Sequence, residues 1–233
     1  MIKSVIALIL ALSMIGPGYK TSYSPEKFVL PEEAAVLVVV EGREDKTCTV
    51  TAFEKNEDKW NPVFAVNGNT GRSGMSRNRK EGDGTTPVGV WMLNTPFGQK
   101  PAEEGFPKDY IKVDSSYVWT EDTNRLTVDP ENKLKGERVG SSEYARVYDY
   151  VLDAGYNRNA VNKKGSALFI HCQGATEAPS SGCIKIPKEE MIQLMKLYGK
   201  YGSGKCFIAQ GIDGEIDKLY DKYGTNNGLE AVY

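Results

Sequence analysis

A histidine and a cysteine lie twelve residues apart in a segment whose residue types are suited to nucleophilic chemistry. His171 is the only histidine in the 233-residue chain, and it follows the short apolar run LFI. Cys183 comes after a loop rich in glycine, serine and proline, and Gly182 directly precedes it. A thiol attacks as its thiolate, and a neighbouring imidazole can supply the base. The pattern therefore predicts acyl transfer by Cys183, with backbone N–H groups near Gly182 placed to stabilise an oxyanion.

The same residues are compatible with two structural roles. Four cysteines in a secreted chain also allow disulfides, for example Cys48–Cys206 and Cys172–Cys183. A zinc site built from His171, Cys172 and Cys183 matches no common ligand spacing. Because neighbouring strand residues point to opposite faces, a strand that continues through Cys172 would place this thiol in the core, away from His171.

A long Gly/Arg/Asn-rich stretch covers residues 66–89 and ends in GDGTTPVG. Its basic residues are Arg72, Arg77, Arg79 and Lys80. Their charge alone favours a solvated surface loop, and a long loop in a compact domain is otherwise typical of a functional segment. The phosphate-binding pattern GxxxxGK[ST] is absent, so the glycines do not indicate a nucleotide site.

The elements that must hold these residues are mostly strands. Apolar and alternating runs predict strands over residues 35–41, 48–53, 166–170, 184–186 and 206–210, and a further short apolar run covers 90–93. An i, i+3, i+4, i+7 stripe predicts an amphipathic helix over 188–200, and its members are Met191, Leu194, Met195 and Tyr198. The same spacing, from Ile216 to Tyr223, predicts a short C-terminal helix. The expected fold class is mainly β, with a few short α-helices.

The two ends of the chain differ from its centre. Lys3 precedes a short apolar run, which predicts a signal peptide or a short N-terminal anchor over residues 1–18. We expect a linker over 19–34, one folded domain over 35–211 and a helical tail over 212–233. This organisation places the body of the protein outside the cytoplasmic membrane, with membrane contact only through an uncleaved N-terminal segment.

The charge balance narrows the class of partner. The chain has 29 Lys and Arg residues against 31 Asp and Glu residues, a formal net charge of −2. A nucleic-acid binder needs a basic surface to neutralise phosphates, so no nucleic-acid partner is expected. The single histidine also excludes sites that need two imidazoles, such as HExxH zinc hydrolases.

Three motifs in this order resemble the L,D-transpeptidase (YkuD-like) catalytic domain. They are GDGTTPVGVWMLNTPFG at 82–98, LFIH at 168–171 and SSGCIKIP at 180–187. The resemblance extends over most of residues 37–208 and implies a strand-dominated, sandwich- or barrel-like domain. It implies that Cys183 is the nucleophile and His171 its base, with no metal or organic cofactor.

The resemblance also implies a substrate class. Such enzymes attack peptidoglycan stem peptides after the third residue, release the terminal D-alanine and transfer the acyl group to an amine, which gives 3–3 cross-links or exchange of the terminal D-amino acid. Transfer to water would make the same residues an L,D-carboxypeptidase. A cell-wall-binding domain with oxidised cysteines is the non-enzymatic alternative. The expected location is extracytoplasmic: secreted, periplasmic or associated with the cell wall.

Two positions depart from the family pattern. Members often have His before Gly-Cys and Arg or Asn two residues after the cysteine, where this chain has Ser181 and Lys185. We therefore expect Gly182, Ser181 and Lys185 to form the oxyanion and substrate-binding surroundings. The resemblance gives Arg77 and Arg79 a second interpretation, because stem peptides carry carboxylates that these side chains can bind.

Overall fold

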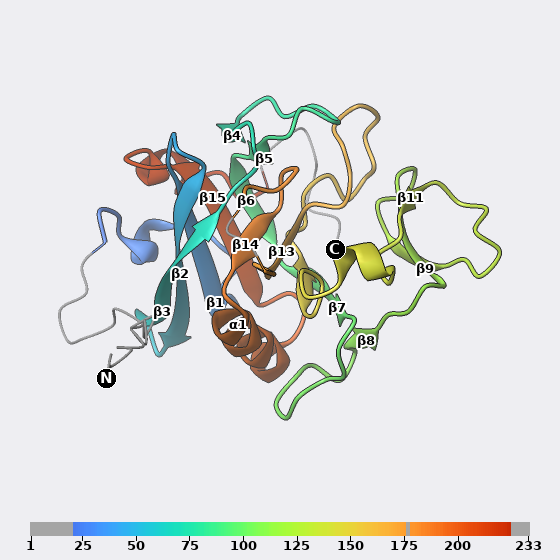
Figure 1. Cartoon of the computed structure of the whole chain (residues 1–233). Coiled ribbons are helices and arrows are strands. Elements are labelled where there is room, and N and C mark those ends of the chain that lie inside the picture. The colour runs from blue at the N-terminus through green and yellow to red at the C-terminus, as the bar shows by residue number, and fades with distance from the viewer. Residues whose placement is uncertain (1–20, 176–177, 225–233) are drawn as a thin grey trace, which may run out of the picture.

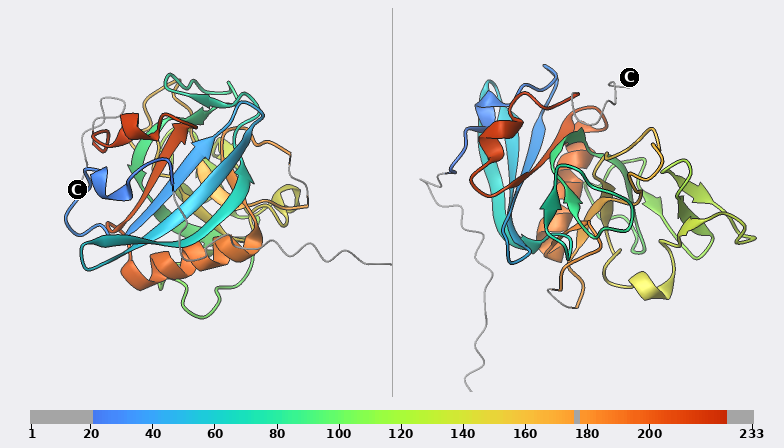
Figure 2. Two further views of the ribbon diagram at one scale, coloured as in Figure 1. Left: turned by 90° about the vertical axis from the view of Figure 1, so that its left-hand side faces the viewer. Right: turned by 90° about the horizontal axis from the view of Figure 1, so that it is seen from above.

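A ten-stranded sheet organises the computed structural model, which describes residues 21–175 and 178–224. The strands follow one another across this sheet in the order β6 (Gly89–Met92), β15 (Cys206–Ile212), β1 (Val36–Gly42), β2 (Thr47–Asn56), β3 (Lys59–Asn69), β14 (Ile184–Ile186), β13 (Phe169–Cys172), β12 (Val151–Asp153), β7 (Asn94–Gly98) and β8 (Ile111–Lys112). The sheet is curled (Figures 1 and 2), and the main core consists of buried apolar side chains from its strands and from the helix described below. The predicted mainly β fold class is confirmed.

The remaining elements are small. A three-stranded sheet has the order β10 (Leu126–Val128), β9 (Tyr117–Thr120) and β11 (Gly136–Glu137), and β4 (Met75–Ser76) pairs with β5 (Thr86–Pro87). The described helices are α1 (Lys188–Tyr201) and three 3-10 turns, η1 (Pro25–Lys27), η2 (Ser142–Tyr144) and η3 (Ile216–Leu219). In Figure 1 the three-stranded sheet lies at the right, to one side of the main sheet.

The continuous apolar run of β1 is explained by burial on both of its faces. Val36, Val38 and Val40 lie in the main core, together with inward side chains of the other strands and of α1. Leu37 and Val39 face the opposite side and belong to a second apolar cluster. The main core also takes up the Met191–Tyr198 stripe of α1, so the stripe predicted from the sequence is a packing surface.

The second cluster is covered by both ends of the described chain. Tyr23 and Phe28 pack against it from the N-terminal side, and Ile216 and Leu219 pack against it from η3. The described part of the expected linker, residues 21–34, is thus packed onto the domain. Residues 1–20, which include the predicted signal segment, lie outside the described residues. No helix in the described part of the chain is long and apolar enough to cross a membrane.

Several elements differ from the sequence-based expectation. The strand expected at 166–170 runs from Phe169 to Cys172, because the chain is still turning at Gly165 and Ala167, where φ is 90° and 54°. The C-terminal helix is the single 3-10 turn η3, since i, i+3 spacing suits a 3-10 turn as well as an α-helix. The strand β3 was not predicted.

Candidate active site

The parallel pairing of β13 with β14 brings the predicted nucleophile and base together. Ile170 pairs with Ile184 and His171 with Lys185, so Cys183 stands just before β14, beside Phe169. Ile170 and Ile184 point into the main core, which leaves His171 and Cys183 on the other face. With strands about 4.8 Å apart and a rise of about 3.3 Å per residue, the two Cα atoms are separated by about 8 Å.

The Cys183 thiol is buried and hydrogen-bonded to backbone groups. Its Sγ donates to the carbonyl of Ala167 at 3.3 Å and accepts from the N–H of Phe169 at 3.4 Å. Burial raises the pKa of the thiol to about 12, and the negative charge of Glu137 acts in the same direction. The Phe169 N–H and the Arg79 guanidinium lower the pKa by smaller amounts. The thiol is therefore protonated at neutral pH before substrate binds.

The His171 imidazole is also buried, and its Nδ1 lies 2.8 Å from the carbonyl oxygen of Cys172. A carbonyl only accepts, so Nδ1 carries the proton and Nε2 is left as the basic nitrogen. Burial is the main cause that lowers the pKa of His171 to about 4, and the charge of Lys185 acts in the same direction. At neutral pH the site thus combines an uncharged thiol with an uncharged imidazole.

A carboxyl group from the small sheet reaches the same centre. Glu137, at the end of β11, accepts a hydrogen bond from the Tyr148 hydroxyl. The Tyr148 ring packs edge-on against His171, with ring centroids 5.0 Å apart, and against Phe169 at 5.8 Å. Partial burial raises the pKa of Glu137 to about 7. Sequence reasoning missed Glu137 and Tyr148, because neither lies in a motif or near the nucleophile in the chain.

The segment before Cys183 is attached to the Gly-rich loop through buried hydrogen bonds. The Thr86 hydroxyl accepts from the N–H of Gly71 at 2.9 Å and donates to the carbonyl of Gly182 at 2.8 Å. The N–H of Arg72 donates to the Ser180 carbonyl at 2.8 Å. Through these bonds, the TTP segment of the Gly-rich loop (85–87) holds the backbone of the SSGC segment (180–183) in place.

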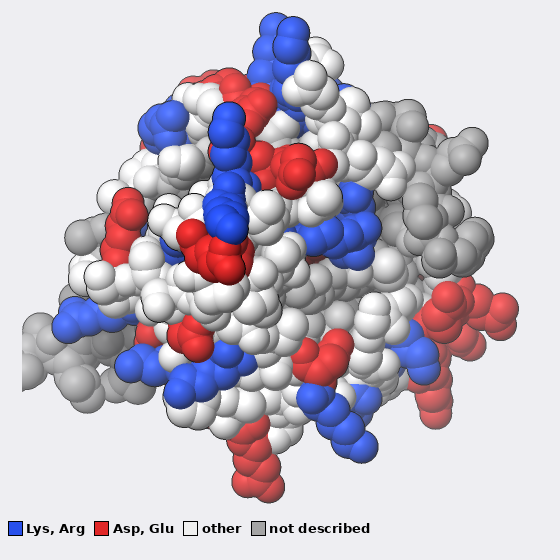
Figure 3. All heavy atoms as spheres, turned by 90° about the vertical axis from the view of Figure 1, so that its right-hand side faces the viewer, with Lys and Arg blue, Asp and Glu red and all other residues white. Residues whose placement is uncertain are grey.

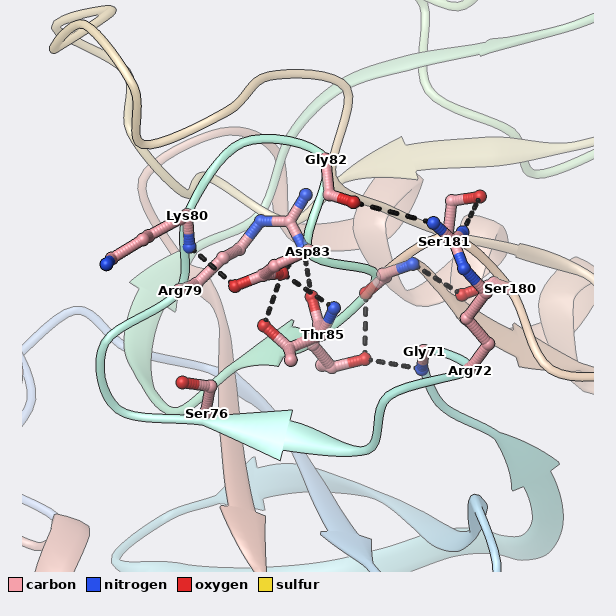
Figure 4. Close-up of polar contacts among 12 residues, drawn as sticks. Gly71, Arg72, Ser76, Arg79, Lys80, Gly82, Asp83, Thr85, Ser180 and Ser181 are labelled. Atoms are coloured by element: carbon pink, nitrogen blue, oxygen red, sulfur yellow. Dashed lines mark hydrogen bonds and ion pairs between the residues drawn. The ribbon is translucent and has the colours of Figure 1, made fainter.

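The loop itself is held by Asp83 and Arg79, which point toward one another in Figure 4. The Asp83 carboxylate accepts from the N–H of Lys80 at 2.7 Å and from the N–H and hydroxyl of Thr85, each at 2.8 Å. The Arg79 guanidinium donates to the Thr85 carbonyl and is 6% exposed. It is thus a buried cation within electrostatic reach of the Cys183 thiol.

Gly182 has a backbone that other residues rarely adopt, with φ at 141°. A Cβ at this position would lie 2.7 Å from Nη1 of Arg79 and 2.8 Å from the Thr85 carbonyl oxygen. The Gly182 N–H donates to the Ser180 hydroxyl at 2.9 Å, so in this structure it already has a partner. Its contribution here is the close approach of the nucleophile loop to the Gly-rich loop.

The other predicted site residues lie in different places. Arg72, an exposed residue, donates to the Ser181 hydroxyl at 2.7 Å (Figure 4). The Lys185 ammonium donates to the Ala178 carbonyl at 2.8 Å, on the same face as Cys183. Arg77 instead forms an ion pair with Glu215, next to η3. The structure therefore brings Lys185 and Arg79 to the nucleophile and leaves Arg77 paired elsewhere.

The four cysteines are all free and buried. Cys172 lies in the main core with Cys48 and Cys206, on the face of β13 opposite His171, as expected for a strand that continues through Cys172. Among the described residues, no group of three or more His, Cys, Asp and Glu side chains is arranged to hold a metal ion. On the face shown in Figure 3, basic and acidic side chains are interspersed.

The chain was compared with protein families, curated sequences and solved structures. The family profile of the L,D-transpeptidase (YkuD) catalytic domain matches residues 37–200. No curated protein sequence matches the chain. Several solved structures are similar to this chain, and it spans about half the length of two of them.

The first is the helical cell shape determining protein Pgp2 from Campylobacter jejuni, at 18% identity and a TM-score of 0.43, with 77% of this chain and 48% of that chain covered. The second is Bd1075 from Bdellovibrio bacteriovorus, at 14% identity and a TM-score of 0.41, with 79% and 52% covered. The profile match includes the loop, the strand and the nucleophile segment described above. The chain therefore belongs to the L,D-transpeptidase (YkuD) catalytic-domain family.

Proposed function

We propose that this protein is a cysteine-dependent L,D-transpeptidase that acts on peptidoglycan stem peptides outside the cytoplasmic membrane. The observation that supports this most is the placement of Cys183 and His171 on one face of adjacent parallel strands. Family membership supports the peptide class, and the buried thiol and imidazole support the chemistry. The products would be 3–3 cross-links or stems with an exchanged terminal D-amino acid.

The neutral resting state determines the order of proton transfers. Nε2 of His171 takes the thiol proton as Sγ of Cys183 attacks the carbonyl carbon of the third stem residue. When the tetrahedral intermediate collapses, the C–N bond breaks and the imidazolium gives its proton to the departing amine of the terminal residue. The acyl group then remains on Cys183 as a thioester.

Two cations are placed to favour the developing negative charge. The Lys185 ammonium shares the face of β14 with Cys183, and the buried Arg79 guanidinium lies behind the Gly182 backbone. A fixed positive charge in a poorly solvated site stabilises an anion more strongly than in water. We assign the stabilisation of the thiolate and the oxyanion to these two side chains. We assign contact with the substrate to the exposed Arg72 side chain and its partner Ser181.

The reaction is tested with purified tetrapeptide muropeptides and mass spectrometry. We expect an acyl adduct on Cys183, and dimers joined 3–3 or exchanged stems as products. Cys183→Ala and His171→Ala should each lower turnover by about a thousandfold or more, since the pair acts as a unit. Cys172→Ala is the matched control, because its thiol lies on the core face and its loss should affect stability.

The product mixture separates the proposed function from its alternatives. Tripeptides alone would identify an L,D-carboxypeptidase that uses the same Cys183 and His171. Unchanged substrate, with no adduct on Cys183, would favour a binding domain without chemistry. Retained turnover in Cys183→Ala would reject the mechanism.

A further inference from the structure

The Glu137 carboxyl is an acidic group at this centre that the proposed mechanism does not use, and its charge acts on the Cys183 thiol more strongly than that of Asp153 does. It comes from β11 of the small sheet, whereas His171 comes from β13 of the main sheet. The Tyr148 hydroxyl bonds to Glu137, and the Tyr148 ring contacts His171. Glu137 is therefore connected to the base through Tyr148, and its charge acts on the nucleophile from a different element.

No described ion pair includes Glu137. The titratable groups around it are Tyr148, Tyr144 and Glu143 on the segment that contains η2, and Cys183 before β14. Its charge acts on the Cys183 thiol, and the negative charge of Glu143 acts on Glu137 itself. Burying a carboxyl group without a cationic partner lowers the stability of the fold. Such unfavourable groups are concentrated at functional sites, so the position of Glu137 near the Cys183 thiol indicates a role in the reaction.

A carboxylate at this place suits one kind of acyl acceptor. An amine reaches the thioester mostly as an ammonium ion, which cannot attack until it has lost a proton. A carboxylate both attracts the ammonium and accepts that proton, whereas a water molecule carries no charge to be attracted. Building on the function proposed above, we propose that Glu137 is the catalytic base that deprotonates an amine acyl acceptor, and that the acceptor is therefore an ammonium-bearing stem or amino acid.

The proton balance of this second half-reaction is complete without another reactant. The ammonium R–NH3+ gives one proton to the Glu137 carboxylate, and the free amine attacks the thioester carbonyl. The C–N bond forms, the C–S bond breaks, and the second nitrogen proton passes through His171 to the Cys183 thiolate. The product amide keeps one N–H, and Glu137 returns its proton to solvent.

Glu137→Gln tests this assignment, because glutamine keeps the shape and an oxygen that accepts from Tyr148 but cannot take a proton. The full chain is mixed with a tetrapeptide muropeptide and a free D-amino acid as the acceptor amine. Mass spectrometry then gives the ratio of exchanged tetrapeptide to tripeptide between about pH 5.5 and 8.5. We expect Glu137→Gln to lower this ratio by about tenfold or more and to remove an acidic limb centred near the Glu137 pKa of about 7.

Two further variants keep the test decisive. Glu143→Gln removes an exposed carboxylate whose charge raises the pKa of Glu137, so the ratio above about pH 8 should be unchanged and the acidic limb should move to lower pH. Tyr148→Phe removes the hydrogen bond that lowers the pKa of Glu137, so the acidic limb should move to higher pH. An unaltered ratio and limb in Glu137→Gln would overturn the assignment, as would a wild-type protein that gives only tripeptide. Absence of any acyl adduct on Cys183 would reject the proposed function itself, and this inference with it.

Discussion

Cys183 and His171 are both uncharged in the resting site, unlike the ion pairs that activate many cysteine nucleophiles. Burial accounts for both states, because it disfavours the thiolate and the imidazolium alike. The cost of charge separation is postponed until substrate is bound, when Lys185 and Arg79 can stabilise the anion. The free thiol should accordingly react slowly with alkylating reagents at neutral pH.

The lowered pKa of His171 makes stability depend on pH. The imidazole has a pKa of about 4 in the folded protein and about 6.5 when unfolded, so the unfolded chain binds a proton more readily. The full stabilisation is present above about pH 6.5 and is lost as the pH falls toward 4, by up to about 3 kcal/mol. Urea unfolding at several pH values should show this loss in the wild-type protein.

His171→Gln provides the comparison, because glutamine does not titrate and the chain has no other histidine. The change in unfolding free energy between pH 7 and pH 4 should be smaller in His171→Gln by about 3 kcal/mol. Equal pH dependence in the two proteins would show that the imidazole is not buried in its neutral form.

Sequence reasoning identified the two residues that are close to each other in the chain. The twelve-residue spacing of His171 and Cys183 reflects two neighbouring parallel strands joined by a loop. Glu137 and Tyr148 were missed because the tertiary fold alone brings the small sheet over the thiol. Arg72 was noticed as a charge, but its bond to Ser181 depends on the pairing of two distant loops.

At the level of elements, the site depends on how two loops are fastened together. Thr86 is buried and joins Gly71 in one loop to Gly182 in the other. The hydroxyl is the only part of the side chain that makes these bonds. Its removal would leave a buried N–H and a buried carbonyl without partners, directly beside the nucleophile.

Thr86→Val tests this connection, because valine keeps the branched shape and lacks the hydroxyl. We expect a loss of about 3 kcal/mol in the unfolding free energy, measured in urea. Turnover of muropeptides should fall further than the unfolded fraction explains, because the Gly182 backbone is no longer held. Thr86→Ser keeps the hydroxyl and should recover most of both; failure of serine to do so would point to packing of the methyl group.

Elements with a strong apolar pattern were predicted closely, and those defined by pairing were not. Runs near β1, β15 and α1 begin within a residue of their observed starts. The missed strand β3 contains Pro62 and several polar residues, and it is a strand because β2 pairs with it across a bulge. The hydrophobic periodicity of a segment does not show which other strand will pair with it.

At the scale of the whole molecule, the position of the small sheet relative to the main sheet depends on a few buried hydrogen bonds. The buried Asn124 side chain accepts from the Trp119 indole at 2.6 Å and from the Ala167 N–H at 3.1 Å. Its amide donates to the carbonyls of Tyr156 and Asn157, each at 2.9 Å. One residue thus connects the small sheet to the strand that leads into His171.

Asn124→Ala should therefore be strongly destabilising. Four hydrogen bonds are lost in a buried site, and we expect the unfolding free energy to fall by about 3 to 5 kcal/mol. Asn162→Ala, at an exposed position, should change it by no more than about 0.5 kcal/mol. A small effect of Asn124→Ala would mean that the two sheets are held by their apolar contacts alone.

The parallel pairing of β1 with β15 also sets the order in which a newly made chain can fold. Val36 pairs with Cys206, so one edge of the valine-rich strand has no partner until the chain has been synthesised as far as β15. Long-range pairing of this kind folds slowly, and an open valine-rich edge is prone to aggregation. For a protein exported as proposed above, this delay would keep the chain unfolded, and so able to pass through a translocation channel, until β15 becomes available.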